Sequence, residues 1–204
     1  MSCKDYKVIL CDRKFITNFV EENHYSGSIN GVISDYSFAL FDGDNLIGAC
    51  IMGRLAMANQ WKRFSDNAND VIELRRLCCI DNTLRNTESF FIGYMLRWLN
   101  KNTDIKIVVS YADAQYNHSG IIYKASNFEY LGFSKGSNVI EYDGKLYHDK
   151  SIRTYYNGIL KPFAVRLNTA ILNGDAKYIE TKGKHTYVYK FKKPRKSNTI
   201  LEMF

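Results

Sequence analysis

The chain has 204 residues, of which 46% are hydrophobic, which is enough for one domain with a core or one domain with a small addition. It lacks a run of about 18 apolar residues, and its first ten residues, MSCKDYKVIL, are charged. We therefore expect a soluble intracellular protein without a membrane span. Five cysteines without CxxC spacing argue against a disulfide framework and against a cysteine zinc site.

Charge is unevenly distributed along the chain. Residues 1–144 hold 15 Lys and Arg against 17 Asp and Glu, a net −2, and residues 145–204 hold 13 against 4, a net +9. Aromatic residues interleave the basic part, which suits a polyanion because lysines neutralise phosphates and rings stack on bases. A solvated basic face is the alternative. We predict a catalytic core over 1–144 and a basic, DNA-binding extension packed on it over 145–204.

The N-terminal third alternates between strand and helix patterns. Residues 6–11 (YKVILC) predict a strand, and Asp12 can cap a helix that runs to about Glu22. Residues 36–41 and 46–52 flank the turn signal DGDN and predict a hairpin.

The remaining elements follow a mixed order. Residues 54–69 are expected to form a long functional loop, since such a connection is otherwise uncommon in a compact domain. The expected elements after it are a strand at 71–80, a helix capped by Asn86 or Thr87, a strand at 105–109, a short helix at 119–126, a strand at 128–133, a hairpin at Asp143-Gly144, a helix at 164–172 and a closing hairpin of 176–181 with 186–192. This order predicts an α/β fold with a mixed central sheet flanked by helices and a parallel step between residues 71 and 110. It resembles the GNAT acyltransferase fold more than a doubly wound nucleotide fold.

The first polar constellation is ENHYSG at residues 22–27, where the opening helix ends. His24 is a candidate general base or metal ligand, and Tyr25 and Ser26 are candidates to orient a substrate by hydrogen bonds. A histidine followed by Ser-Gly is also a common arrangement at a helix end. Both interpretations stay open.

The second constellation is ELRRL at residues 73–77. Strand alternation predicts Glu73, Arg75 and Leu77 on one face and Leu74 and Arg76 on the other. At least one charged residue must then find a partner on a covered face. An ion pair within the sheet is the simpler interpretation, and a charged group beside the reacting atoms is the alternative.

The third constellation follows the strand at 105–109, where open α/β sheets place their ligands. Its members are Ser110, Tyr111, Asp113 and His118, with Tyr123 and Asn127 on the next helix. Asp113 could accept a proton from an amine or orient His118. Any metal site would combine distant residues, with His24, Asp113 and His118 as candidates.

Together these blocks resemble the phage Mom family, the DNA adenine modification proteins of Mu-like phages. The matching segments are NHYSG (23–27), FDGDNLIGACIMG (41–53), IELRRL (72–77), NTESFFIGYMLRWLNKN (86–102), VVSYADAQYNHSGIIYKASNFEYLG (108–132) and KHTYVYKF (184–191). The resemblance implies a GNAT-like transferase of the host cytoplasm that adds a carbamoylmethyl group to the N6 amine of adenine in DNA. That modification would protect phage DNA from host restriction.

The resemblance also implies roles for individual residues. The catalytic set is His24, Tyr25, Ser110, Tyr111, Asp113 and His118, and the substrate-binding set is Ser26, Glu73, Arg76, Tyr123 and Asn127. Arg76 rather than Arg75 takes the family's arginine place. The expected DNA contacts are Lys184 and His185, together with the basic residues Lys190, Lys192, Lys193, Arg195 and Lys196. The base is expected to be flipped out or single-stranded, stacking on Tyr25, Tyr111 or Trp61.

This chain departs from typical acetyltransferases in the segment that would bind the donor. A typical acetyltransferase binds coenzyme A phosphates on a glycine-rich turn before a helix, and the corresponding DNTLRNTES has no glycine. This argues against coenzyme A, so the donor stays open between acetyl-coenzyme A and another activated small group, with a bound iron as a further candidate. The alternatives are a GNAT acyltransferase acting on a protein or small-molecule amine, and a non-catalytic DNA-binding protein.

Overall fold

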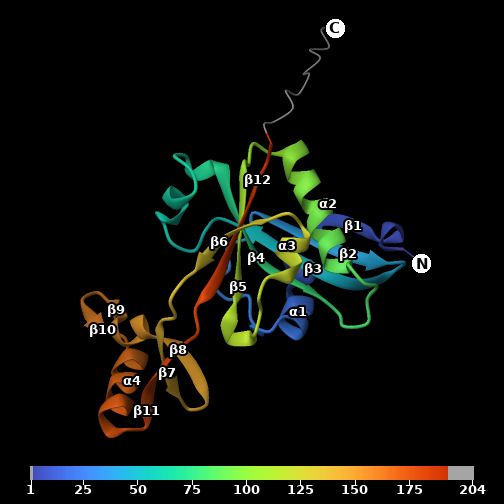
Figure 1. Cartoon of the computed structure of the whole chain (residues 1–204). Helices are drawn as coiled ribbons and strands as arrows, with labels where there is room; N and C mark the ends of the chain where they lie inside the picture. Colours follow the sequence, from blue (N-terminus) through green and yellow to red (C-terminus); the bar gives the residue numbers. More distant parts are fainter. Residues whose placement is uncertain (1, 193–204) are drawn as a thin grey trace. The chain divides into compact units, whose positions relative to one another are not determined.

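The computed structural model describes residues 2–192 of the chain (Figure 1). These residues divide into two compact units. Among the described residues, unit 1 consists of 2–112, 119–132 and 185–192, and unit 2 consists of Asp113–His118 and Phe133–Lys184. The predicted boundary at residues 144 and 145 falls within unit 2.

Unit 1 is built around a seven-stranded sheet with the order β1-β2-β3-β4-β5-β12-β6. The strands are β1 (Lys7–Cys11), β2 (Tyr36–Asp42), β3 (Asn45–Gly53), β4 (Val71–Cys79), β5 (Ile107–Asp113), β12 (Lys184–Lys190) and β6 (Glu129–Phe133). Strands β1 to β4 pair antiparallel, and β4 pairs parallel with β5. The predicted hairpin and the predicted parallel step are therefore confirmed.

Three helices accompany this sheet, namely α1 (Arg13–Asn23), α2 (Thr87–Asn102) and α3 (Ile121–Ala125). The Asp12 carboxylate caps α1 by accepting from the backbone N–H of Lys14 (2.7 Å), as predicted. Along β2 and β3 the side chains alternate between two cores, because successive residues of a strand point to opposite faces. The helix α1 packs with Ala39, Ala49 and Ile51 on one face, and α2 packs with Phe38, Cys50 and Met52 on the other. No helix of the described residues is long and apolar enough to cross a membrane.

Unit 2 contains a second, three-stranded sheet with the order β11-β7-β8 and one long helix. Its elements are β7 (Asn138–Tyr142), β8 (Lys145–His148), β9 (Tyr155–Tyr156), β10 (Ile159–Leu160), α4 (Pro162–Asn173) and β11 (Ala176–Glu180), with 3-10 turns at Ala114–Tyr116 and Asp149–Arg153. Its core combines Ile140 with Leu167, Ala170 and Ala176. The helix α4 thus covers one face of this small sheet.

Two predicted elements differ from the structure. The closing hairpin is wrong, because β11 pairs with β7 while β12 belongs to the large sheet between β5 and β6. The strand predicted at 105–109 begins at Ile107 and continues to Asp113. Ser110, Tyr111 and Asp113 are therefore strand residues rather than residues that follow a strand.

Candidate active site

The site of interest in unit 1 lies where β4 and β5 stop pairing. The ladder between them runs from Val71 and Ile107 to Leu74 and Ser110. Beyond Leu74, β4 stays paired with β3 through Cys79. The carboxyl-terminal parts of two adjacent parallel strands thus separate at this point, which is where α/β sheets commonly place ligands.

A β-bulge sets which side chains of β4 reach this point. Ile51 pairs with Arg76 and Met52 pairs with Leu74, so Arg75 is an extra residue on β4. The strict alternation predicted for ELRRL is therefore wrong. Leu74 and Leu77 both pack in the core with α2, and Glu73 and Arg76 both take the opposite face, on the side of α1.

Arg76 is the half-buried cation of this face. Burial lowers the pKa of its guanidinium, and the charge of Arg75 adds to this, whereas Tyr25 and Glu73 act in the opposite direction. Its Nη1 donates to the Arg75 carbonyl (2.8 Å), and its Nε is buried without a hydrogen-bond partner among the described residues. A cation with an unused buried donor is suited to bind an anionic or carbonyl oxygen of a ligand.

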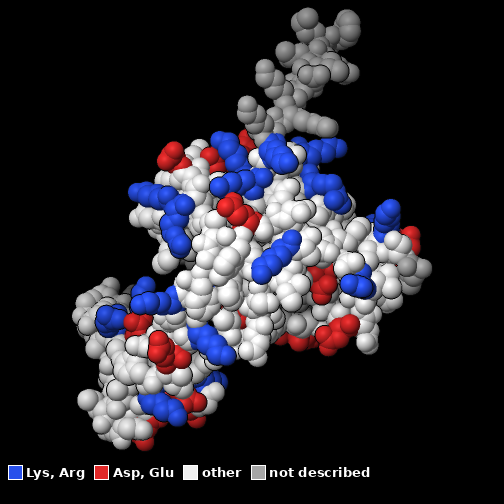
Figure 2. Space-filling view, viewed as in Figure 1, with Lys and Arg blue, Asp and Glu red and all other residues white. Residues whose placement is uncertain are grey.

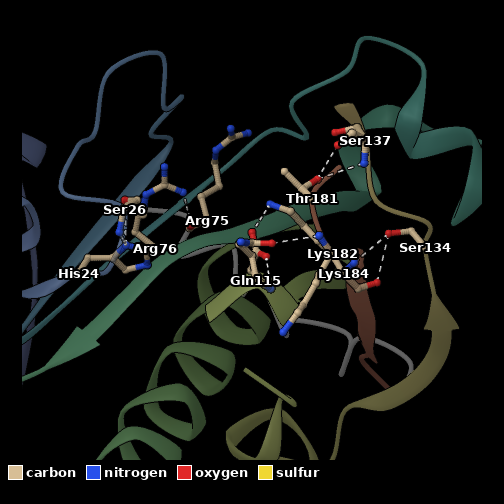
Figure 3. Close-up of polar contacts among 11 residues, drawn as sticks. His24, Ser26, Arg75, Arg76, Gln115, Ser134, Ser137, Thr181, Lys182 and Lys184 are labelled. Atoms are coloured by element: carbon tan, nitrogen blue, oxygen red, sulfur yellow. Dashed lines mark hydrogen bonds and ion pairs between the residues drawn. The ribbon is translucent and has the colours of Figure 1, made fainter. Parts of the chain in front are cut away.

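Arg75 also has a buried Nε without a hydrogen-bond partner among the described residues, but its terminal nitrogen reaches the loop before β4. Its Nη1 donates to the Arg54 carbonyl (2.7 Å) and lies 3.6 Å from Glu73 Oε2, and its side chain is only 10% exposed. This contact ties the start of the long loop at 54–69 to β4. Figure 3 shows Arg75 extending away from His24 and Ser26, next to which Arg76 is drawn.

His24 and Ser26 form a compact group after α1. The Ser26 backbone N–H donates to His24 Nδ1 (3.1 Å), and the Ser26 hydroxyl lies 2.9 Å from the same nitrogen (Figure 3). The backbone and the hydroxyl of Ser26 thus both engage Nδ1 and fix the orientation of the ring. The Ser26 hydroxyl then donates to the Ser28 carbonyl (3.1 Å). The Tyr25 ring stacks on His24 with 4.1 Å between centroids, and Tyr25 is exposed.

The loop that carries these residues is anchored by Arg13, on the first turn of α1. Its two terminal nitrogens donate to the carbonyls of Val32 (2.7 Å) and Ile29 (2.9 Å). Both residues are buried, so the irregular segment after α1 is held at two points. Arg13 therefore positions the loop of His24 and was not recognised from the sequence, because its partners are backbone atoms of no particular residue type.

Tyr111 supplies a phenol on the same face as Glu73. Its hydroxyl accepts from Gln60 Nε2 (2.7 Å), so its own proton remains available for another acceptor. Burial and the charge of Glu73 raise the pKa of Tyr111 to about 12. The buried Oε1 of Gln60 has no hydrogen-bond partner among the described residues. Gln60 and the neighbouring Trp61 belong to the loop predicted as functional, and Trp61 packs with Tyr111.

Ser110 and Tyr123 lie on the other face, towards α2 and α3. The Ser110 hydroxyl donates to the Leu74 carbonyl (3.3 Å). Burial raises the pKa of Tyr123, and the charges of Tyr25 and Glu73 act in the same direction. The structure therefore divides the predicted residues of unit 1 between the two faces of the sheet, with Ser110 and Tyr123 on the side of α2 and Glu73, Arg76 and Tyr111 on the other.

Asp113 and His118 belong to unit 2. The Asp113 carboxylate accepts from the Gln115 backbone N–H (3.0 Å) and pairs with Lys184 Nζ (3.0 Å). The His118 backbone N–H donates to the Asp113 carbonyl (3.2 Å), and the His118 side chain is exposed. Asp113 is thus held as a capped, ion-paired carboxylate in a tight turn, with Lys184 as its partner.

The other predicted contacts lie on the surface. Asn127 is exposed in a left-handed turn (φ 62°), and the half-buried His185 contacts the Tyr130 hydroxyl through Nδ1 (3.0 Å). Lys190 and Lys192 are exposed. Lys193, Arg195 and Lys196 lie outside the described residues.

The fold of this chain is that of the GNAT acetyltransferases. It resembles a probable acetyltransferase from Staphylococcus epidermidis with a TM-score of 0.52 and 10% identity, covering 92% of this chain and 99% of that one. A GNAT family acetyltransferase from Elizabethkingia anophelis, solved with acetyl-CoA bound, gives a TM-score of 0.50 at 8% identity with the same coverage.

Sequence comparison gives the family. Residues 5–203 match the Mom protein family, so the chain belongs to that family. It is 30% identical over 154 residues to the methylcarbamoylase Mom of Escherichia phage Mu, an alignment that covers 73% of this chain. The chain spans 62% of the length of that relative.

Proposed function

We propose that this protein is a transferase that modifies the N6 amine of adenine in DNA by carbamoylmethylation, protecting phage DNA from host restriction. Its family membership supports this, together with one structural observation. Arg76 and Glu73 lie on one face of β4, where β4 and β5 separate, and Tyr25 lies close enough to Arg76 to act on its pKa. A cation, a carboxylate and an exposed ring gathered at a strand opening suit a flat, polar substrate such as a purine.

The reaction needs a proton acceptor. One N–H bond of the amine breaks as one N–C bond forms, and the bond between the transferred carbon and its leaving group breaks with the electron pair going to that leaving group. The adenine amine is a weak nucleophile because its lone pair is delocalised. Glu73 is the carboxylate on the unit 1 face of β4, and Asp113 is the base predicted from the sequence. We assign His24 the role of orienting the purine ring or the donor group by a hydrogen bond.

The phenols complete the site as neutral groups. Because burial raises the pKa of Tyr111 to about 12, its hydroxyl is protonated at neutral pH and can donate to a developing negative charge. Tyr25 offers an exposed ring on which a base can stack, and the half-buried Trp61 offers a second ring from the loop. Arg76 supplies the positive charge beside them.

The donor is proposed to be an activated small group. The turn before α2 has no glycine, and Asn86 there takes a left-handed conformation (φ 71°) that asparagine tolerates. If coenzyme A carries the group, cationic side chains would replace the usual backbone cradle, and Lys4 and Arg85 line an open cavity of about 640 Å³ at this turn. Calorimetry with acetyl-coenzyme A tests this directly.

A bound iron is a second proposal from the family resemblance. Among residues 2–192, no group of three or more His, Cys, Asp or Glu side chains is arranged to hold a metal ion. His24 Nδ1 is engaged by Ser26, so Nε2 is the ring nitrogen that could serve as a ligand. Metal analysis of the purified protein decides the question.

DNA is the proposed partner, and unit 1 offers a basic surface for it. Exposed cations lie at the carboxyl end of α2, at the start of β5, at the end of β12 and on the loop before β4, and Figure 2 shows Lys and Arg gathered there. They are Arg97, Lys101, Lys106, Lys190, Lys192, Lys62 and Arg63. Such a surface attracts phosphates independently of base sequence.

The experiment is mass spectrometry of nucleosides from bacteria that express the chain. A modified deoxyadenosine is expected with the wild type and is lost with Arg76→Ala, whereas Arg75→Ala retains it. Unmodified DNA in cells that contain folded wild-type protein would contradict the proposal. Acetyl-coenzyme A binding with acetylation of a protein or small-molecule amine would instead favour the alternative acyltransferase, and DNA binding without any modification would favour a binding protein.

A further inference from the structure

Unit 2 carries a short hairpin whose apolar side chains face solvent. Tyr155, Tyr156 and Ile159 are 58%, 70% and 73% exposed. Tyr156 pairs directly with Ile159 across β9 and β10, so both side chains stand on one face of the hairpin. The connecting Asn157-Gly158 has φ values of 48° and 76°, the arrangement of a tight two-residue hairpin turn.

This hairpin is held firmly at its base. The Lys161 backbone N–H donates to the Thr154 carbonyl (2.9 Å), which extends the pairing of the two strands. Asn168 on α4 donates from its side chain to the Ile152 carbonyl (3.0 Å) just before the hairpin. Figure 1 shows β10 leading into α4, which begins at Pro162. The exposed side chains are therefore displayed on a preorganised element, which lowers the entropic cost of inserting them into a partner.

The chain segment that carries the hairpin is rich in cations. Residues 144–170 contain five Lys and Arg and one acidic residue, Asp149, which pairs with Arg153. The cations are Lys145, Lys150, Arg153, Lys161 and Arg166. Figure 2 shows Lys and Arg side chains on this part of unit 2. An apolar, partly aromatic tip in a positive field is complementary to a polyanion with an apolar interior, which describes double-stranded DNA.

We propose that the β9–β10 hairpin is a DNA wedge. Tyr156 and Ile159 insert between neighbouring base pairs, and Lys150 and Lys161 contact the flanking phosphates. This inference rests on the proposed function, because the adenine amine of a duplex lies within a base pair and the base must leave the stack before the amine can react. Apolar side chains inserted at a base step unstack it and bend the duplex, and so make such an exit easier.

The test uses the full chain and a DNA duplex with 2-aminopurine placed at successive adenine positions, without any donor. Wild-type protein is expected to raise the fluorescence of the probe at one or more positions, because unstacking relieves its quenching. The variant Tyr156→Ser/Ile159→Ser should lose that rise and bind the duplex at least about ten-fold more weakly, since the one aromatic stack that it removes is worth about a factor of ten. Circular dichroism confirms that the variant is folded.

The matched control is Val165→Ser/Leu172→Ser, which removes two exposed apolar side chains of α4 (48% and 86% exposed) and should leave fluorescence and affinity unchanged. The proposal would be overturned if the wild type did not raise the 2-aminopurine fluorescence, or if Tyr156→Ser/Ile159→Ser raised it as much as the wild type. It would also be overturned if the control variant lost fluorescence and affinity to the same extent as Tyr156→Ser/Ile159→Ser. A further contrary result would come from sedimentation, if the wild type were a dimer and Tyr156→Ser/Ile159→Ser a monomer. The hairpin would then be an interface between two copies of the chain. Failure of the proposed function shows separately, as unmodified deoxyadenosine in cells, while the fluorescence result requires no chemistry.

Discussion

Glu73 and Arg76 lie three residues apart on β4, yet their side chains share one face of the sheet. Three positions along a regular strand would place them on opposite faces. The bulge at Arg75 adds one residue and restores the common face, while Leu74 and Leu77 both remain in the core with α2. The bulge is thus the local feature that brings a carboxylate and a guanidinium to the same point.

The first prediction concerns this bulge. Deleting one of the two adjacent arginines removes the extra residue and leaves every other side chain of β4 on its present face. The shortened protein should therefore stay folded, with its single arginine in the place of Arg76, and should retain modification. Deleting Leu77 instead moves Cys78 to the opposite face and should abolish folding. Thermal unfolding and nucleoside mass spectrometry report the two properties.

The second prediction concerns Asp113. Asp113→Asn keeps an oxygen that can cap the Gln115 N–H but removes the charge that pairs with Lys184. Modification should be lost, while DNA affinity stays within about two-fold. Lys184→Met is the control, because it removes the same ion pair and leaves the carboxylate in place. A large loss of affinity in Asp113→Asn would show Asp113 to be structural.

The third prediction concerns high pH. The pKa of Tyr111 is raised from 10.0 to about 12 in the folded protein. An unfolded tyrosine releases its proton at about pH 10, so the folded state binds more protons between these values and loses stability as pH rises from about 10 to about 12. The stability of Tyr111→Phe should fall less steeply with pH over this interval than that of the wild type. Tyr155→Phe changes an exposed position, and its stability should follow that of the wild type. Thermal melts at several pH values measure both, and identical slopes for wild type and Tyr111→Phe would refute the prediction.

The fourth prediction concerns two glycines in unit 2. A Cβ on Gly136 would lie 1.5 Å from the Thr181 carbonyl oxygen, and one on Gly183 would lie 1.6 Å from the Ser134 carbonyl oxygen. The two segments run side by side, linked by hydrogen bonds between Ser134 and Lys184 and between Ser137 and Thr181 (Figure 3).

Gly183→Ala should therefore destabilise the protein by about 3 kcal/mol or more, because backbone has to move. Gly174→Asn in the same unit has open space and a left-handed φ of 82° that asparagine tolerates, and should cost less than about 1 kcal/mol. Chemical denaturation compares the two variants. If Gly183→Ala and Gly174→Asn were equally stable, the two segments that run side by side at Gly136 and Gly183 would have to move apart at little cost.

The fifth prediction concerns the basic end of the chain. Neutralising Lys190, Lys192, Lys193 and Lys196 should reduce the slope of log affinity against log salt concentration by about 3 to 4, since each phosphate contact contributes about 0.9. The modification chemistry on bound DNA should persist. Fluorescence anisotropy over a salt series measures the slope, and an unaltered slope would remove these lysines from the DNA contact.

The candidate residues of unit 1 were proposed from the sequence, but their arrangement could not be predicted from it. His24, Glu73, Arg76 and Tyr111 stood out because polar side chains follow or interrupt apolar segments. The roles of Gln60 and Arg13 were not predictable, because their hydrogen bonds join residues far apart in sequence or end on backbone carbonyls. The bulge also escaped prediction, since nothing in ELRRL marks which arginine is the extra residue.

The sequence by itself determined the opening strand and helix and the hairpin of β2 and β3, because capping, turn chemistry and hydrophobic periodicity act between neighbours in the chain. It also determined the mixed order of strands and helices and, through its blocks of characteristic residues, the family. Only the tertiary structure decided that β12 joins the large sheet and β11 the small one, because strand pairing between distant segments depends on which edges are available. It likewise decided which face Arg76 takes, since an inserted residue changes the direction of a side chain without changing the pattern of the sequence.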